Sequence, residues 1–130
     1  MFKWLKSNRQ SSGGGPDYSA VDSREKAEAL VKRGELQKLL LLPAEFGGED
    51  IPPNIVFVPP FVVELKTESD RNVVLPLAQK GTIKRYQANP TYQDKSLVPI
   101  SITIVAFDPG SFTTTIAIWG KGLNANLPRA

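Results

Sequence analysis

The second half of the chain carries a two-residue alternation, and this pattern constrains the fold more than any other feature of the sequence. In the segments 82–88, 98–107 and 112–120, side chains alternate between two faces, as they do in strands with one buried face. The sequence "DPGS" at 108–111 is typical of a turn, and we expect Gly110 to take a positive φ there. The pattern predicts a meander of three antiparallel strands.

Helical spacing dominates the first half of the chain. Residues 24–42 place apolar side chains on one stripe after a cap at Asp22 or Ser23. We expect a helix over this range, divided at Gly34 and ended by Pro43, with the four leucines closing it against the core.

Two proline pairs enclose the next apolar run. Residues 55–58, "IVFV", predict a short buried strand, and Pro59 and Pro60 suit the start of a helix over 61–80. The alternative is a strand followed by a shorter helix, because Pro76 requires a kink or a break in one long helix. The long helix would place the following residues on one stripe: Phe61, Val62, Leu65, Ser69, Asn72, Val73, Pro76, Leu77 and Lys80.

The expected order is therefore helix, strand, helix and three-strand meander. It predicts an α+β fold, with two or three helices packed on one face of a small, mainly antiparallel sheet. We expect one globular domain over 17–122, a flexible basic arm over 1–16 and a frayed tail over 123–130. The arm interleaves apolar and basic residues, so it is a disordered leader or a weak anchor to a membrane surface.

Two residue types are missing, and their absence narrows the function. The chain has no Cys and no His, which removes thiolate nucleophiles, the usual zinc ligands and the commonest general base. We therefore expect no cofactor, no metal and no enzymatic activity. A chain without cysteine also fits a reducing compartment, so we expect a soluble, cytoplasmic protein of bacterial type.

The net charge of +3 comes from the first 15 residues, which hold three basic side chains and no acid. The remainder is balanced, with 13 basic and 13 acidic side chains. Because phosphate binding needs clustered cations, nucleic acid is a minor hypothesis.

Three groups of residues are candidate binding sites. The first combines Glu45, Glu49 and Asp50 with Phe46 and a glycine pair, which predicts a mobile acidic loop for a basic protein partner. A calcium site is disfavoured, since the alternating ligand pattern of a calcium loop is absent.

The second group consists of Lys84, Arg85, Tyr86 and Tyr92. Basic and aromatic residues together are typical of protein interfaces and, less specifically, of surfaces that stack bases. On a strand, however, Lys84 and Tyr86 share one face and Arg85 takes the other, so the cluster is small.

The third candidate is the edge of the last strand. Its unpaired backbone groups could accept a partner strand or a second copy of the chain, which would give a homodimer. Trp119 is either an anchor at this edge or a cap on the core.

These features favour a small non-enzymatic protein-binding module of inhibitor, immunity or adaptor type. The alternative is a small carboxylate-based enzyme or ligand-binding domain. That alternative requires Glu45, Glu49, Asp50, Glu64 or Glu68 to converge in one cleft.

Overall fold

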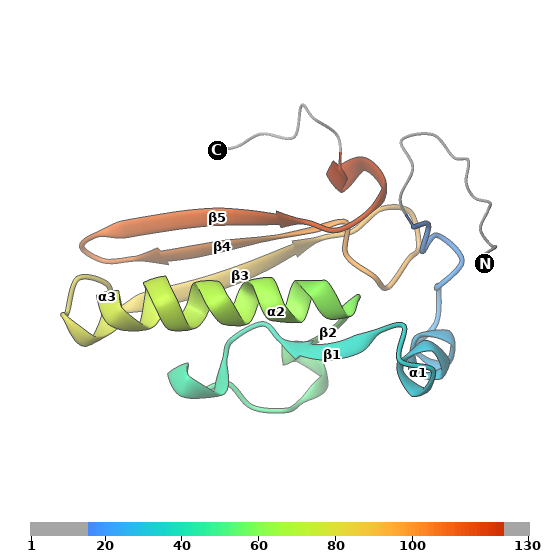
Figure 1. Cartoon of the computed structure of the whole chain (residues 1–130), viewed down its shortest axis with the longest axis horizontal. Helices are drawn as coiled ribbons and strands as arrows, with labels where there is room; N and C mark the ends of the chain where they lie inside the picture. Colours follow the sequence, from blue (N-terminus) through green and yellow to red (C-terminus); the bar gives the residue numbers. More distant parts are fainter. Residues whose placement is uncertain (1–15, 124–130) are drawn as a thin grey trace.

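The computed structural model describes residues 16–123, which form an α+β fold with one long helical segment and two antiparallel sheets (Figure 1). The predicted arm and tail lie outside the described residues except at Pro16 and Leu123. The helices and strands are α1 Arg24–Lys32, β1 Gln37–Leu40, β2 Ile55–Val58, α2 Pro60–Ser69, α3 Leu75–Gln79, β3 Arg85–Thr91, β4 Ser101–Phe107 and β5 Ser111–Ala117.

The predicted meander is confirmed. β4 lies between β3 and β5 and is antiparallel to both. Directly opposed residues share a face of the sheet. The rows on the buried face are Tyr86–Ala106–Phe112, Ala88–Ile104–Thr114 and Pro90–Ile102–Ile116.

The turn between β4 and β5 differs from the expectation in one respect. Asp108, and not Gly110, takes the positive φ, at 81°. Gly110 donates its N–H to the carbonyl of Thr82 at 2.8 Å, and a Cβ on Gly110 would lie 2.7 Å from the Thr82 side chain. The glycine therefore allows a close approach of two segments.

The prediction of a helix over 24–42 is wrong beyond Lys32. Gly34 has a φ of 78°, which ends the helical path, and the first two leucines of the run, Leu39 and Leu40, then lie in β1. β1 pairs antiparallel with β2, with Leu39 opposite Val56. Four consecutive leucines suit a helix or a strand, and the pairing with β2 decides between them. The order is therefore helix, two strands, helix and three strands, in two sheets where one was expected.

The predicted helix after Pro60 is confirmed, and Pro76 does not break it. A π-helical segment, Asp70–Val74, joins α2 to α3, and the Leu75 N–H bonds the carbonyl of Asp70, five residues earlier. Proline lacks an N–H and its ring crowds the preceding turn, so a wider turn accommodates it.

The predicted stripe on this helix is wrong in register. Val62, Lys66, Asp70 and Val74 are the buried residues of the helical segment, and they follow one another at intervals of four. Two residues of the predicted stripe, Phe61 and Leu65, are 40% and 49% exposed. The buried face therefore includes a lysine and an aspartate.

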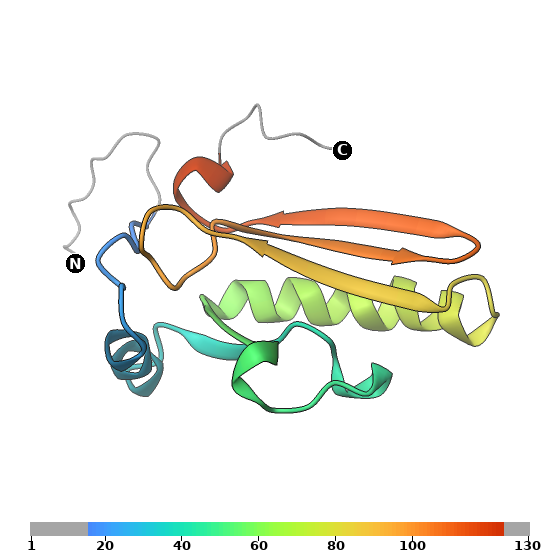
Figure 2. The same ribbon diagram turned by 180° about the vertical axis from the view of Figure 1, so that it is seen from behind.

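Figures 1 and 2 show the long helix running between the three-stranded sheet and the β1–β2 pair. α1 lies beside the start of β1 (Figure 1). The hydrophobic core joins the helix to both sheets, and its members include Leu36, Phe57, Val58, Val62, Ile102, Ile104, Ile118 and Trp119.

Candidate functional site

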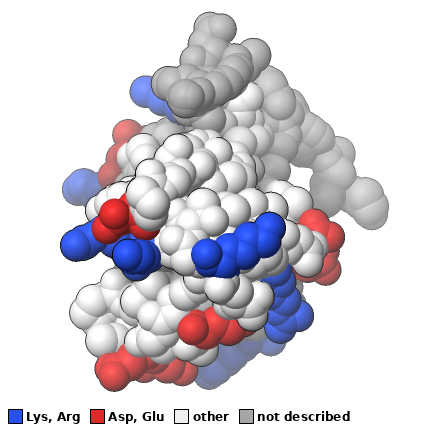
Figure 3. Space-filling model, turned by 90° about the vertical axis from the view of Figure 1, so that its left-hand side faces the viewer, with Lys and Arg blue, Asp and Glu red and all other residues white. Residues whose placement is uncertain are grey.

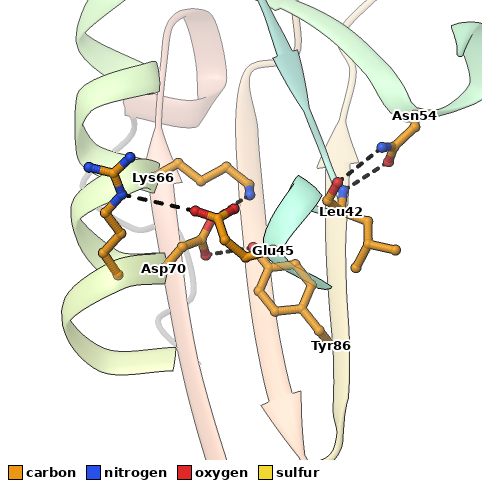
Figure 4. A network of polar contacts seen from close by, with 7 residues as sticks. Leu42, Glu45, Asn54, Lys66, Asp70 and Tyr86 are labelled. Carbon is orange, nitrogen blue, oxygen red and sulfur yellow. Dashed lines mark hydrogen bonds and ion pairs between the residues drawn. The ribbon is translucent and has the colours of Figure 1, made fainter. Parts of the chain in front are cut away.

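Two of the predicted groups meet in the structure. The ring of Phe46, from the acidic group, stacks on the ring of Tyr86, from the basic and aromatic group, with centroids 5.3 Å apart. The Tyr86 hydroxyl donates to Oδ1 of Asp70 at 2.7 Å, and Nζ of Lys66 donates to Oδ2 of Asp70 at 2.7 Å (Figure 4). A polar network thus connects the short helical turn before Gly47 with the long helix and β3.

Burial sets the chemistry of this network. The Lys66 side chain is only 1% exposed, and its desolvation lowers the pKa of Lys66, while Asp70 and then Glu45 oppose that shift. Burial also raises the pKa of Tyr86, and its hydrogen bond to Asp70 adds to the effect. The Lys66 ammonium group lies 5.2 Å from the centre of the Tyr86 ring. Lys66 and Asp70 therefore form a buried ion pair beside the ring of Tyr86.

A cavity of about 260 Å³ lies beside this ion pair, between β1, the turn at Ala44–Phe46 and the long helix. Glu45 lies close to Lys66 and Asp70 (Figure 4), and its carboxylate is 4.0 Å from Nε of Arg71. Charged and apolar residues line the cavity together: Lys38, Leu39, Leu40, Pro43, Ala44, Glu45, Lys66, Thr67, Asp70 and Arg71.

The acidic loop, residues 41–54, is held closed by Asn54. The Asn54 amide accepts from the N–H of Leu42 at 2.8 Å and donates to the carbonyls of Leu42 and Glu49, both at 3.0 Å. The Leu41 N–H also bonds the Asn54 carbonyl at 2.9 Å. These bonds tie both ends and the middle of the loop together.

The glycine pair in the acidic loop has a structural role. Gly47 has a φ of 91°, which ends the short helical turn. A Cβ on Gly48 would lie 1.7 Å from the Leu42 carbonyl oxygen, so only glycine fits against that strand end. The pair predicts mobility from sequence, but in the structure it allows close packing of the loop on itself.

The acidic loop presents its charges to solvent. Glu45, Glu49 and Asp50 are exposed, and Ile51 next to them is 46% exposed. Across residues 16–123, no group of three or more carboxylates is arranged to hold a metal ion. The loop therefore combines a hydrogen-bonded backbone with three exposed acids and one large exposed apolar side chain.

The second predicted group is dispersed. Arg85 pairs with Asp108 at 3.3 Å, Lys84 is exposed, and Tyr86 points into the network described above. Tyr92 is 47% exposed but follows the far end of β3. Figure 3 shows the end of the molecule that carries the β4–β5 turn, where basic and acidic side chains are interspersed. These residues do not form one cationic surface.

The third candidate, the edge of the last strand, is present in the structure, but Trp119 is not an anchor at that edge. Trp119 is buried, and its Nε1 donates to the carbonyl of Val98 at 2.8 Å, so it belongs to the core. β5 forms the last strand of its sheet. Within residues 16–123, the backbone of β5 has hydrogen-bond partners only in β4.

The carboxylates of the alternative hypothesis do not converge on one place. Glu45 borders the cavity beside Lys66, whereas Glu64 and Glu68 border a separate shallow hollow on the outer face of the long helix. The sequence reading missed Lys66 and Asp70. Their spacing of four on a helix was a visible signal, but their burial depends on Tyr86 from another element.

No family model, no curated protein and no solved structure matches this chain. Within the described range 16–123, no helix combines the length and the apolar character that a membrane crossing requires. The function is therefore inferred from the geometry of the chain itself.

Proposed function

We propose that the chain is a non-enzymatic protein-binding module, of inhibitor, immunity or adaptor type, whose recognition element is the acidic loop. The observation that carries the proposal is the set of three hydrogen bonds from the Asn54 amide. They tie the backbone of Leu42 and Glu49 to Asn54, while the side chains of Glu49 and its neighbour Asp50 stay exposed. A cytoplasmic location stays a prediction from the absence of cysteine.

A loop that is ordered before binding loses little conformational freedom on binding, and this favours affinity. The carboxylates would steer a basic partner toward the loop. Ile51, which follows Asp50 and is 46% exposed, would supply an apolar contact beside the acids. The expected partner is a protein with a basic surface, since the same acids repel the phosphates of nucleic acid.

The test compares two charge reversals of equal size. The first is Glu49→Lys with Asp50→Lys in the acidic loop. The matched control is Glu64→Lys with Glu68→Lys on the exposed face of α2, where neither glutamate forms an ion pair within the described residues. Both variants have the same net charge, so effects of overall charge cancel.

Partners are captured from the native cell by crosslinking, and their association rates are then measured at low and high salt. We expect the loop variant to associate at least about tenfold more slowly at low salt and to lose most of its salt dependence. The control variant is expected to keep the wild-type rate. Equal rates for the two variants would rule out the acidic loop as the recognition element.

The cavity beside Lys66 favours a second candidate, which is the binding of a small anionic ligand. Three cations and two acids line the cavity, and Lys38 also pairs with Glu28 at 3.4 Å. Arg71, 4.0 Å from Glu45 and with its side chain 67% exposed, is the cation most open to an anion. A panel of small carboxylates and phosphates, screened by thermal shift on wild type and on Arg71→Gln, tests it. Stabilisation of the wild type that is lost in the variant would support a ligand site.

A further inference from the structure

The two edges of the three-stranded sheet differ in their protection. Proteins keep edge strands from pairing with other chains by means of charges, prolines or bulges. β3 has Arg85 and Pro90. β5 reads "SFTTTIA", with no charge and no proline, and all seven residues pair with β4 in one continuous register. Among the described residues, β5 is therefore the edge without such protection.

The register identifies the backbone groups that β5 offers. The Ile118 N–H bonds the carbonyl of Ile100 at 2.8 Å. Hydrogen-bonded and non-hydrogen-bonded pairs alternate along an antiparallel ladder, so the groups of Phe112, Thr114 and Ile116 point toward β4. The backbone N–H and C=O groups of the alternate residues point outward, away from β4. These residues are Ser111, Thr113, Thr115 and Ala117.

We propose that β5 pairs antiparallel with β5 of a second copy, which joins two three-stranded sheets into one of six strands. Full overlap of the seven residues places the two-fold axis at Thr114. Thr113 then lies opposite Thr115 of the second copy on the outer face. On the inner face, Phe112 lies opposite Ile116 of the second copy. Both are favourable cross-strand pairs: an aromatic side chain opposite a β-branched one, and threonine opposite threonine.

Two observations favour a second copy over an unrelated strand. β5 carries no charge that could select a different sequence, and self-pairing brings no like charges together. The chain also forms this type of contact internally, since the hydroxyls of Thr103 and Thr115 lie 3.1 Å apart across β4 and β5. Residues 16–130 have balanced charge, so two copies do not repel each other strongly.

The proposed interface leaves the acidic loop free. In Figures 1 and 2, β5 and the segment that joins β1 to β2 lie on opposite sides of the molecule. A dimer would present two acidic loops, and simultaneous binding of both can raise the apparent affinity by roughly 10²–10⁴. The dimer goes beyond the proposed function and does not depend on it.

The first test measures the mass of the full chain by sedimentation equilibrium over a wide concentration range. We expect a reversible monomer–dimer equilibrium. Thr113→Lys with Thr115→Lys is expected to raise the dimer dissociation constant at least about tenfold, since self-pairing would then oppose like charges. The matched control is Gln87→Lys with Asn89→Lys, which lie in the same two rows and on the same face at the β3 edge. It is expected to dimerise as the wild type does.

The second test uses the absence of cysteine, which makes a single introduced thiol unique. Thr114 would face its own counterpart in a non-hydrogen-bonded pair, where Cα atoms are about 4.5 Å apart and a disulfide fits. Thr114→Cys is expected to form a disulfide-linked dimer under mild oxidation. Ser111→Cys, at the end of the same strand, is expected to stay unlinked.

A chain that is monomeric at every concentration would overturn the dimer and leave the acidic loop untouched. Two further results would also contradict it: dimers that persist in the Thr113 and Thr115 double variant, or equal crosslinking at Ser111 and Thr114. Conversely, if the chain dimerises but the acidic-loop variant binds its partners at the wild-type rate, the proposed function is wrong and the dimer stands.

Discussion

Lys66 and Asp70 are the residues whose placement departs most from what their chemistry suggests. Lysine and aspartate are seldom fully buried unless they are paired, and here each is the partner of the other. Removing one member of such a pair leaves an uncompensated charge, which costs more than removing both.

We expect Asp70→Ala to reduce the free energy of unfolding by roughly 3–5 kcal/mol, because Lys66 would remain buried without its carboxylate. The double variant Lys66→Met with Asp70→Ala is expected to be less destabilised than Asp70→Ala alone. Urea denaturation of the wild type, Asp70→Ala, Lys66→Met and the double variant measures both. A double variant that loses the sum of the two single losses would show that the residues do not interact.

Tyr86, which belongs to the same network, makes the stability of the fold depend on pH. Its pKa is raised in the folded state, so folding holds the phenol proton more tightly than the unfolded chain does. This contribution to stability is fully present below the ordinary tyrosine pKa, about 10, and is lost as the pH rises above it. Lys66 acts in the opposite sense, since its lowered pKa makes stability rise with pH up to the ordinary lysine value.

We expect Tyr86→Phe to be less stable than wild type at neutral pH and to lose less stability between neutral and strongly alkaline pH. Tyr92→Phe is the comparison: burial alone raises the pKa of Tyr92, without a hydrogen bond, so this variant is expected to change the alkaline slope in the same sense but by less. Stability curves at a series of pH values give the comparison. Identical alkaline slopes for wild type and Tyr86→Phe would disprove the role of the Tyr86 proton.

At the scale of the elements, the acidic loop depends on one side chain. Asn54→Ala removes three hydrogen bonds and leaves the Leu42 N–H without its partner. We expect a loss of about 1–3 kcal/mol and faster amide exchange at Leu42. Asn72→Ala, at an exposed position of the long helix, is the control and is expected to change neither. An Asn54→Ala protein with wild-type exchange at Leu42 would mean that the loop closes without this side chain.

Elements with a clear period or clear flanking residues could be predicted from sequence, and an element that fits two periods could not. The three-strand meander follows from its alternation, and the helix after Pro60 from the proline pair. The leucine run could not be assigned, because four leucines fit either period and their strand state depends on β2, which lies beyond the loop. The register of the long helix was wrong because the buried face contains Lys66 and Asp70, which a hydrophobic pattern treats as exposed.

The candidate site, too, could be predicted from the sequence only in part. The exposure of Glu45, Glu49 and Asp50 could be predicted from their charge. The stacking of Phe46 on Tyr86 could not, since it depends on how two distant segments pack. The closure of the acidic loop by Asn54 could not be predicted either, because its side chain bonds backbone groups that no sequence pattern reveals.

At the scale of the whole molecule, the core of the described residues joins both sheets to the helical segment. We therefore expect deletion of residues 1–15 to leave the melting temperature nearly unchanged. Differential scanning calorimetry of the full and shortened chains measures it. A large drop would mean that the deleted residues contribute to the core.

The proposed function is tested most directly by the order of the acidic loop in the free protein, measured as NMR backbone order parameters from ¹⁵N relaxation. A preorganised loop predicts values near 0.85 for residues 44–51, similar to those of α2. The Asn54→Ala variant is expected to lower these values in the loop alone. Values below about 0.6 in the wild-type loop would contradict a preorganised recognition element.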